Sequence, residues 1–343
     1  MPSERTKSYA RVLRVWTFEI IVKQLDVTRV AAVLRRLAAS IVGIVAALVV
    51  AEYGTRFVFA RAAATGTSEN AAARIGGLHV SMNSLGYRER EIGPKDPARY
   101  RIAVIGDSYT WGQALEERER FSNLLGEFLG PGYEVLNFGQ PGNTVEGDRD
   151  ELEQVLKLSP DFVLLQMYIN NFETPSMRRP QTYALLPTDL VRRLLQSSMV
   201  YRLLSDRWAQ LQEAVGFVDS YEGYMARHLR DPHSPDAQES FGVLRQFFDT
   251  ARAAGVPSGS ILFPAADAMG PFGTNYSFGY LHDHVKSVCV DERVHCLDLL
   301  PLFSALPDPR STWVTPFDAH PNARTNRRAA REILREFGPV WRR

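Results

Sequence analysis

The feature that most constrains the fold is a regular alternation of short apolar runs and amphipathic stretches from about residue 98 onward. The apolar runs lie at 102–105, 135–138, 162–168, 260–263 and 294–299. The amphipathic stretches lie near 121–129, 145–157, 236–254, 278–288 and 323–337. Strands that alternate with helices predict a parallel sheet covered by helices on both faces. The longest interruption of this alternation is at about 175–235, where we expect a helical insertion. Such an insertion covers a functional site, faces a membrane or is a plain surface insertion.

A second feature is a long apolar stretch near the start of the chain. Residues 37–51 carry no charge, and apolar character continues to residue 60. A helix over 37–60 is long enough to cross about 30 Å of hydrocarbon. Glu52 and Arg56 are four residues apart, so we expect them to pair near one interface. The alternative is a buried core helix.

The charges before this stretch predict its orientation. The arm at 1–36 holds eight basic residues against Glu4, Glu19 and Asp26. An arm of this length is too long for the basic start of a cleaved signal peptide. The positive-inside rule places such an arm in the cytoplasm. We therefore expect a cytoplasmic arm at 1–36, a transmembrane helix at 37–60, a linker and lead-in at 61–97, and an extracytoplasmic domain at 98–343, in the periplasm or outside the cell.

Polar stretches follow several of the predicted strands. They are GDSYT from 106, NFGQPGNT from 137, YINNFE from 168 and, after a loop, FDAHPN from 317. In an open parallel sheet, ligands bind beyond the carboxyl ends of the strands. These four stretches are therefore the expected site.

The residue types in these stretches suit acyl transfer. Ser108 is the candidate nucleophile, His320 its base and Asp318 the carboxylate that orients the imidazole. The backbone N–H groups of Ser108 and Gly142 and the side-chain amide of Asn170 are three candidate donors to an oxyanion. Taken singly, each motif also has a structural explanation: a turn or helix cap at 106–108, a turn at Gly142, a strand end at Asn170 and a helix start at 318–322.

Several other kinds of site find no support in the sequence. It contains no Gly-x-Ser-x-Gly elbow, HExxH motif, Walker A loop or dinucleotide fingerprint. With two cysteines and no zinc-type CxxC pair, we do not expect a cysteine-rich metal site. The net charge of +1 gives no sign of a nucleic-acid partner. Cys289 and Cys296 form either a disulfide or two buried thiols. His282 and His284 are expected at the surface.

The four motifs together resemble those of the SGNH/GDSL hydrolase superfamily. GDSYTWG resembles its serine block, QPGNT its glycine block, YINN its asparagine block and DAHPN its Asp–His block, while NSLGYRERE is similar to the lead-in of membrane-anchored bacterial members. The resemblance covers about residues 80–340. Two positions depart from the family pattern: Asn171 stands where Asp is usual, and Asp318 precedes the histidine by two residues instead of three.

The resemblance implies a flavodoxin-like α/β/α sandwich and a serine hydrolase without metal or cofactor. It implies the same nucleophile, base, orienting acid and oxyanion donors as above. We expect a membrane-anchored esterase that acts on carboxyl esters, including acetyl esters, of a cell-envelope glycan or lipid. The alternatives are an O-acyltransferase with the same triad and a catalytically silent glycan-binding protein. The acyl group, the acceptor and the oligomeric state stay open.

Overall fold

The computed structural model describes residues 27–65, 80–177, 185, 198–315 and 318–341. The chain divides into a larger compact unit, Phe59–Leu185 with Asp206–Arg343, and a smaller one, Met1–Val58 with Leu186–Ser205. Residues 1–26 of the predicted arm, 66–79 of the predicted linker, and 178–184 and 186–197 of the predicted insertion lie outside the described residues.

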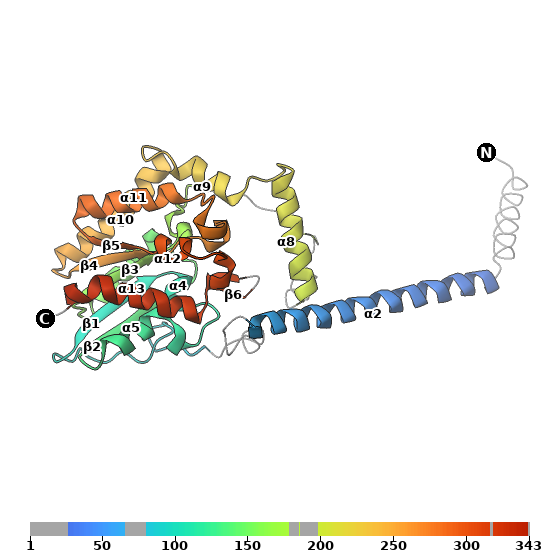
Figure 1. Ribbon diagram of the computed structural model, residues 1–343, viewed down its shortest axis with the longest axis horizontal. Helices are drawn as coiled ribbons and strands as arrows, with labels where there is room; N and C mark the ends of the chain where they lie inside the picture. The colour runs from blue at the N-terminus through green and yellow to red at the C-terminus, as the bar shows by residue number, and fades with distance from the viewer. Residues whose placement is uncertain (1–26, 66–79, 178–184, 186–197, 316–317, 342–343) are drawn as a thin grey trace, which may run out of the picture. The chain divides into compact units, whose positions relative to one another are not determined.

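The larger unit contains a five-stranded sheet in which every pairing is parallel. The strands are β1 (Tyr100–Gly106), β2 (Tyr133–Gly139), β3 (Phe162–Met167), β4 (Ser258–Leu262) and β5 (His295–Asp298). Their order is β2-β1-β3-β4-β5 (Figure 1). This is the flavodoxin-like strand order. The chain adds β2 on one side of β1 and β3 to β5 on the other, so the topological switch point lies between β1 and β3. The predicted fold class is confirmed, with each strand within two residues of its predicted position.

Two helical layers cover the sheet because successive strand residues point to opposite faces. Ala103 and Ile105 of β1 point into one apolar cluster, and Ile102 and Val104 into the other. Helices α6 (Val145–Leu156), α10 (Pro235–Ala253) and α11 (Gly279–Glu292) complete the first cluster. Helices α5 (Phe121–Leu129) and α13 (Ala323–Trp341) complete the second.

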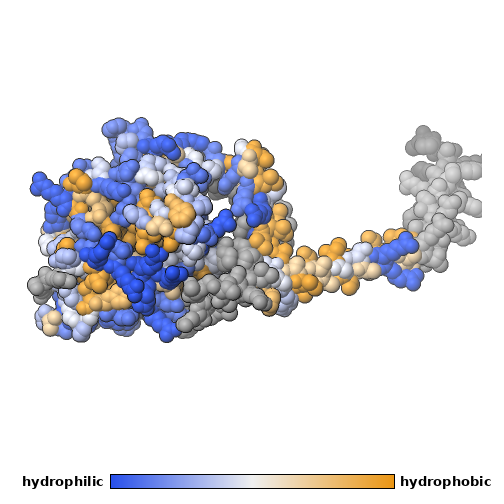
Figure 2. Space-filling model, viewed as in Figure 1, coloured by the Kyte–Doolittle hydropathy of each residue, from blue (hydrophilic) through white to orange (hydrophobic). Residues whose placement is uncertain are grey.

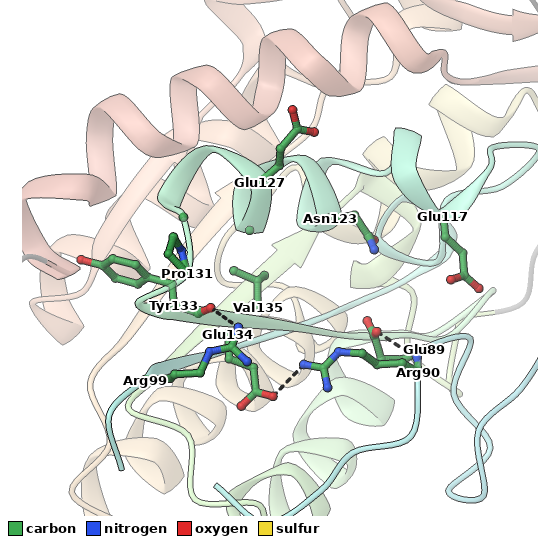
Figure 3. Close-up of a pocket in the computed structure, with 12 residues that line it drawn as sticks. Glu89, Arg90, Arg99, Glu117, Asn123, Glu127, Pro131, Tyr133, Glu134 and Val135 are labelled. Atoms are coloured by element: carbon green, nitrogen blue, oxygen red, sulfur yellow. Dashed lines mark hydrogen bonds and ion pairs between the residues drawn. The ribbon is translucent and has the colours of Figure 1, made fainter. Parts of the chain in front are cut away.

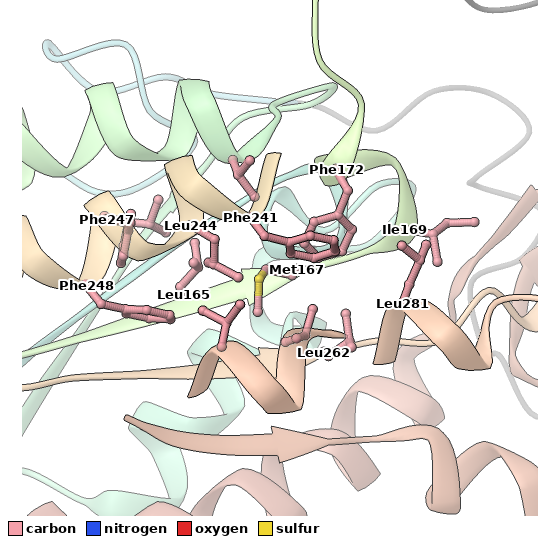
Figure 4. Close-up of a cluster of buried hydrophobic side chains, with 14 of the residues drawn as sticks. Leu165, Met167, Ile169, Phe172, Phe241, Leu244, Phe247, Phe248, Leu262 and Leu281 are labelled. Carbon is pink, nitrogen blue, oxygen red and sulfur yellow. The ribbon is translucent and has the colours of Figure 1, made fainter. Parts of the chain in front are cut away.

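The first cluster is rich in aromatic side chains. Figure 4 shows Phe172 and Phe241 side by side near Met167; their rings are tilted by 36° and the ring centroids lie 5.3 Å apart. Phe247 and Phe248 of α10 extend the cluster along the sheet. Large rings of this kind dominate the apolar area that a core buries, so α10 is fixed firmly over β3 and β4.

The remaining elements of the larger unit are short. They are α4 (Ser108–Trp111), α9 (Tyr221–Leu229), α12 (Leu300–Ser304), the antiparallel strands β6 (Trp313–Thr315) and β7 (Asp318–Pro321), and the 3₁₀ turns η1 (Glu117–Glu119), η2 (Ile169–Phe172), η3 (Ala266–Ala268), η4 (Pro271–Gly273) and η5 (Pro309–Thr312). A disulfide joins Cys289 of α11 to Cys296 of β5, which decides between the two states left open by the sequence.

The smaller unit contains the long helix α2 (Val27–Thr65) as far as Val58, and the start of α8 (Met199–Ala214) as far as Ser205. Within α2, the 28 residues Val30–Phe57 are long and apolar enough to cross a membrane, and none of this span is buried. At 1.5 Å per residue it measures about 42 Å. Glu52 and Arg56 form the predicted ion pair, with 2.7 Å between Oε1 and Nε.

Candidate active site

Ser108 stands at a sharp turn between β1 and α4. Asp107 is the cap of α4, and its Oδ1 accepts a hydrogen bond of 2.8 Å from the backbone N–H of Tyr109. The turn packs tightly against β3: a Cβ on Gly106 would lie 2.6 Å from Oε1 of Gln166. Only glycine fits at this point, and the serine is presented just beyond the strand end.

The Asp107 carboxyl is fully buried beneath the turn. Burial raises its pKa to about 6, while the hydrogen bond from Tyr109 and attraction to His320 favour the charged form. Asp107 therefore braces the turn and also places a titratable group under the site.

His320 and Asp318 lie on the short strand β7. The Nε2 atom of His320 is 2.8 Å from Oγ of Ser108, and its Nδ1 atom is 2.5 Å from Oδ1 of Asp318. Residues two apart on a strand point to the same side. The spacing of two residues is therefore compatible with an Asp–His pair because the segment is extended rather than helical.

The segment after His320 also forms the start of a helix, which is the structural explanation of the motif at 318–322. Asn322 accepts a hydrogen bond of 2.9 Å from the backbone N–H of Thr325 at the start of α13. Its side-chain amide donates to the backbone oxygens of Ser311 and Trp313, at 2.9 and 3.1 Å. The helix-start explanation and the catalytic explanation of this motif thus apply to different residues.

Aromatic rings pack against the imidazole. The Tyr109 ring lies 5.2 Å from that of His320 and stacks at 4.4 Å on Tyr168. Neither tyrosine has a predicted role in the site. Both lie within the polar stretches GDSYT and YINNFE, which is the local signal that could have identified them.

The candidate oxyanion donors come from neighbouring strand ends. Gly142 lies in the turn after β2 with φ of +80°, a conformation that favours glycine. Asn170 lies in η2, directly after β3. Because β2 and β3 flank β1 in the sheet, the structure brings both residues to the edge that carries Ser108.

A buried carboxylate, missed by the sequence analysis, joins these two turns. The Oδ1 atom of Asp148 accepts from Nδ2 of Asn143 at 2.8 Å, and its Oδ2 accepts from Nδ2 of Asn171 at 3.1 Å. The Oδ1 atom of Asn171 accepts from the backbone N–H of Tyr168 at 2.7 Å. Burial, reinforced by the charge of Asp107, raises the pKa of Asp148 well above its usual range. Asn171, at the position where the family has Asp, therefore acts as a donor here.

Another histidine–carboxylate pair, His282 with Asp298, is separate in sequence from the four site motifs. His282 is buried, which contradicts the surface position expected from the sequence. Its Nδ1 atom is 2.8 Å from Oδ1 of Asp298, and its Nε2 atom is 2.8 Å from the Tyr276 hydroxyl. Both ring nitrogens are satisfied, which is what makes burial of a polar ring tolerable. His284 is only partly exposed and lies 3.1 Å from the backbone oxygen of Arg230.

A cavity of about 450 Å³ lies between α5 and β2 and contains no residue of the Ser–His–Asp set (Figure 3). Part of its charged wall is paired: Arg90 lies 2.6 Å from Glu134, and Arg99 donates to the backbone oxygen of Tyr133. The cavity is therefore a polar surface pocket separate from the Ser–His–Asp set. In the described part of the chain, no group of three or more His, Cys, Asp or Glu side chains is arranged to hold a metal.

Among the comparisons with known proteins, one family model matches most of the chain. A model of the GDSL-like Lipase/Acylhydrolase family matches residues 104–328. Similar solved structures include TesA, with 14% identity, a TM-score of 0.44, and coverage of 70% of this chain and 99% of that one. Est24, a carbohydrate acetylesterase from Sinorhizobium meliloti, has 12% identity, a TM-score of 0.44, and coverage of 71% and 100%. The esterase EstA from Pseudoalteromonas sp. has 13% identity, a TM-score of 0.42, and coverage of 70% and 98%. No curated protein matches the sequence.

Proposed function

Because the chain belongs to the GDSL-like lipase/acylhydrolase family, a family of ester-hydrolysing enzymes, we propose that it is a membrane-anchored serine esterase acting on carboxyl esters, including acetyl esters, of a cell-envelope glycan or lipid. The observation that carries the proposal is the continuous chain of contacts from Ser108 through His320 to Asp318, at 2.8 and 2.5 Å.

In the proposed mechanism, Ser108 donates its hydroxyl proton to Nε2 of His320 and attacks the ester carbonyl carbon. Asp318 holds the Nδ1–H of the imidazole and stabilises the imidazolium that forms. The imidazolium then protonates the departing alcohol. Water, deprotonated by His320, attacks the acyl-enzyme and releases the acid and free Ser108.

The tetrahedral intermediate carries a negative oxygen that needs hydrogen-bond donors. We assign this role to the backbone N–H groups of Ser108 and Gly142 and to the side-chain amide of Asn170. Within the described residues, no hydrogen bond uses Nδ2 of Asn170, and its Oδ1 is buried without a partner. An unpaired amide at the sheet edge that carries Ser108 supports this role. Loss of one such donor is expected to cost about 10²- to 10³-fold in kcat.

The test is hydrolysis of p-nitrophenyl acetate and labelling by a fluorophosphonate, using the full chain in detergent micelles. Ser108→Ala should abolish both, and His320→Ala should lower both by several orders of magnitude. Ser277→Ala, a serine outside the site, is the matched control and should keep wild-type rates. Full turnover in Ser108→Ala would refute the assignment. Absence of labelling in folded wild-type protein would favour the silent glycan-binding alternative.

Transfer of the acyl group to a sugar hydroxyl uses the same acyl-enzyme, so the reaction product separates esterase from O-acyltransferase. We expect free acid as the product from acetylated glycan and lipid esters. An acylated sugar formed in preference to free acid, when a sugar acceptor is present, would overturn hydrolysis as the main activity.

The proposal extends to location. We infer that α2 anchors the protein, with residues 1–36 in the cytoplasm and the domain at 98–343 outside it. The Cys289–Cys296 disulfide supports an extracytoplasmic position of the domain, because disulfides persist mainly in oxidising compartments. Protease added to intact spheroplasts should degrade the domain and spare an epitope placed at residue 1. Protection of the domain would overturn the orientation.

A further inference from the structure

The helix α8 presents an apolar stripe to solvent. Leu204, Trp208 and Leu211 are 53%, 37% and 51% exposed, and Val215, one residue past the helix end, is 68% exposed. Their spacings are four, three and four residues, which at about 100° per residue place all four within about 60° of arc. Phe217, at 67% exposed, continues the apolar surface beyond the helix. Figure 2 shows hydrophobic side chains along α8.

The stripe lies beside the side of α8 that packs most closely against protein. Among the described residues of this part of the helix, Gln212 is only 3% exposed, and it lies about 70° around the helix from the middle of the stripe. Leu204, Leu211 and Val215 stay more than half exposed. An amphipathic helix of a water-soluble domain normally turns its apolar side to the core. Contiguous exposed apolar surface of this kind marks a contact with another body.

The start of α8 is fastened to the candidate membrane span. Glu52 of α2 accepts hydrogen bonds from Oγ of Ser198 at 2.8 Å and from the backbone N–H groups of Met199 and Val200 at 3.0 and 3.1 Å. These are the N–H groups that a helix leaves unsatisfied at its first turn. A side chain of the span therefore supplies the cap of α8.

The position of Glu52 fixes the depth at which α8 begins. Glu52 lies five residues before Phe57, the end of the apolar span, which is about 8 Å along the helix. The span is about 42 Å long and the hydrocarbon core about 30 Å thick, so Glu52 falls near the headgroup region. The cap that Glu52 provides holds the first turn of α8 at that level.

We propose that α8 is an interfacial helix whose apolar stripe inserts into the outer surface of the same bilayer that α2 spans. The occupant is lipid because the stripe belongs to a helix whose first turn is bound to the span itself. Trp208 within the stripe fits a headgroup boundary, where indole rings concentrate. Helices that lie in this plane bury an apolar face about 5–10 Å deep. This inference rests on the anchoring proposed above.

The test is nitroxide scanning of the full chain in phosphatidylcholine nanodiscs. One label is placed in the stripe by Leu211→Cys, one on the opposite side of α8 by Glu213→Cys, and one in the span by Val45→Cys. Cys289 and Cys296 are joined in a disulfide and do not take the label. Fluorophosphonate labelling of each variant checks that it is folded, and Leu204→Cys replaces Leu211→Cys if the latter fails this check.

The readout is collision of the label with dissolved oxygen, which concentrates in lipid, against a water-soluble nickel chelate. We expect oxygen to dominate by several-fold at 211 and 45, and nickel to dominate at 213. Nickel dominance at 211 with oxygen dominance at 45 would overturn the interfacial helix and leave the anchor intact. Shielding of 211 from both reagents would overturn it in favour of a protein partner, such as a second copy. Nickel dominance at 45 would overturn the anchor itself.

Discussion

Replacement of Asp107 by Asn should make the protein more stable at neutral pH. Asn can accept the same hydrogen bond from Tyr109, and the two residues are comparable helix caps. Asn carries no charge, so the cost of burying a carboxylate disappears. The variant therefore separates the capping role of Asp107 from its charge.

The magnitude follows from the raised pKa. Between pH 3.8, the usual pKa of Asp, and about pH 6, its pKa in the fold, the unfolded chain loses a proton that the folded chain retains. Stability therefore falls as pH rises through this window and is level above it. At 1.36 kcal/mol per pH unit, the interval of about 2.2 units corresponds to about 3 kcal/mol. Asp107→Asn should match wild type at pH 4 and exceed it by about 3 kcal/mol at pH 7.

The assay is urea unfolding of the full chain in detergent micelles, followed by tryptophan fluorescence from pH 4 to pH 8. Asp283→Asn, at an exposed aspartate of α11, is the control and should leave the pH profile unchanged. A difference between Asp107→Asn and wild type that does not vary with pH, or a variant less stable than wild type at pH 7, would refute the reasoning. Esterase activity should fall, because the carboxylate also attracts the imidazolium of His320.

Three further substitutions probe how the site is held. Asn171→Asp should place a second carboxyl group against that of Asp148 and so lower both stability and kcat/KM. The double variant Asn171→Asp with Asp148→Asn restores an amide donor to this pair and should recover most of the lost stability and kcat/KM. Equal loss of stability in the single and double variants, measured by urea unfolding, would contradict the pairing. Gly139→Ala should destabilise by several kcal/mol, because a Cβ there would lie 2.2 Å from a backbone nitrogen of α4, and an unchanged Tm would refute this. Asp318→Asn should lower kcat/KM about 10²- to 10⁴-fold while circular dichroism stays unchanged; wild-type kinetics would remove Asp318 from the mechanism.

The strands could be predicted from the sequence because apolar runs of strand length report burial directly. Their ends could not. β2 begins at Tyr133, two residues before the predicted run, because Glu134 is buried beside Arg101 with 2.7 Å between the charged atoms. A charge that is satisfied by another strand looks, in sequence, like a charge that faces water.

The same limit applies to the site. Ser108 and His320 could be identified as candidates because each lies in a polar stretch that follows a predicted strand, directly or after a loop. Asp148 was not, since it lies in the acidic stretch VEGDRDELEQ of α6, where nothing marks the one carboxylate that turns inward. The surface position predicted for His282 was wrong for a related reason. Its hydrogen-bond partners, Tyr276 and Asp298, are 6 and 16 residues away in the sequence, so no local pattern around His282 indicates that its ring is buried and paired.

The contact between Ser108 and His320 joins positions 212 residues apart. Asn326 reinforces the same closure, since its Oδ1 atom accepts from the backbone N–H of Phe121, 205 residues earlier. During synthesis from the N-terminus, the proposed nucleophile is therefore made long before its proposed base, and no partial chain that stops before His320 has both. The proposed hydrolysis thus requires that β7 and α13, the last strand and helix, have been made and packed.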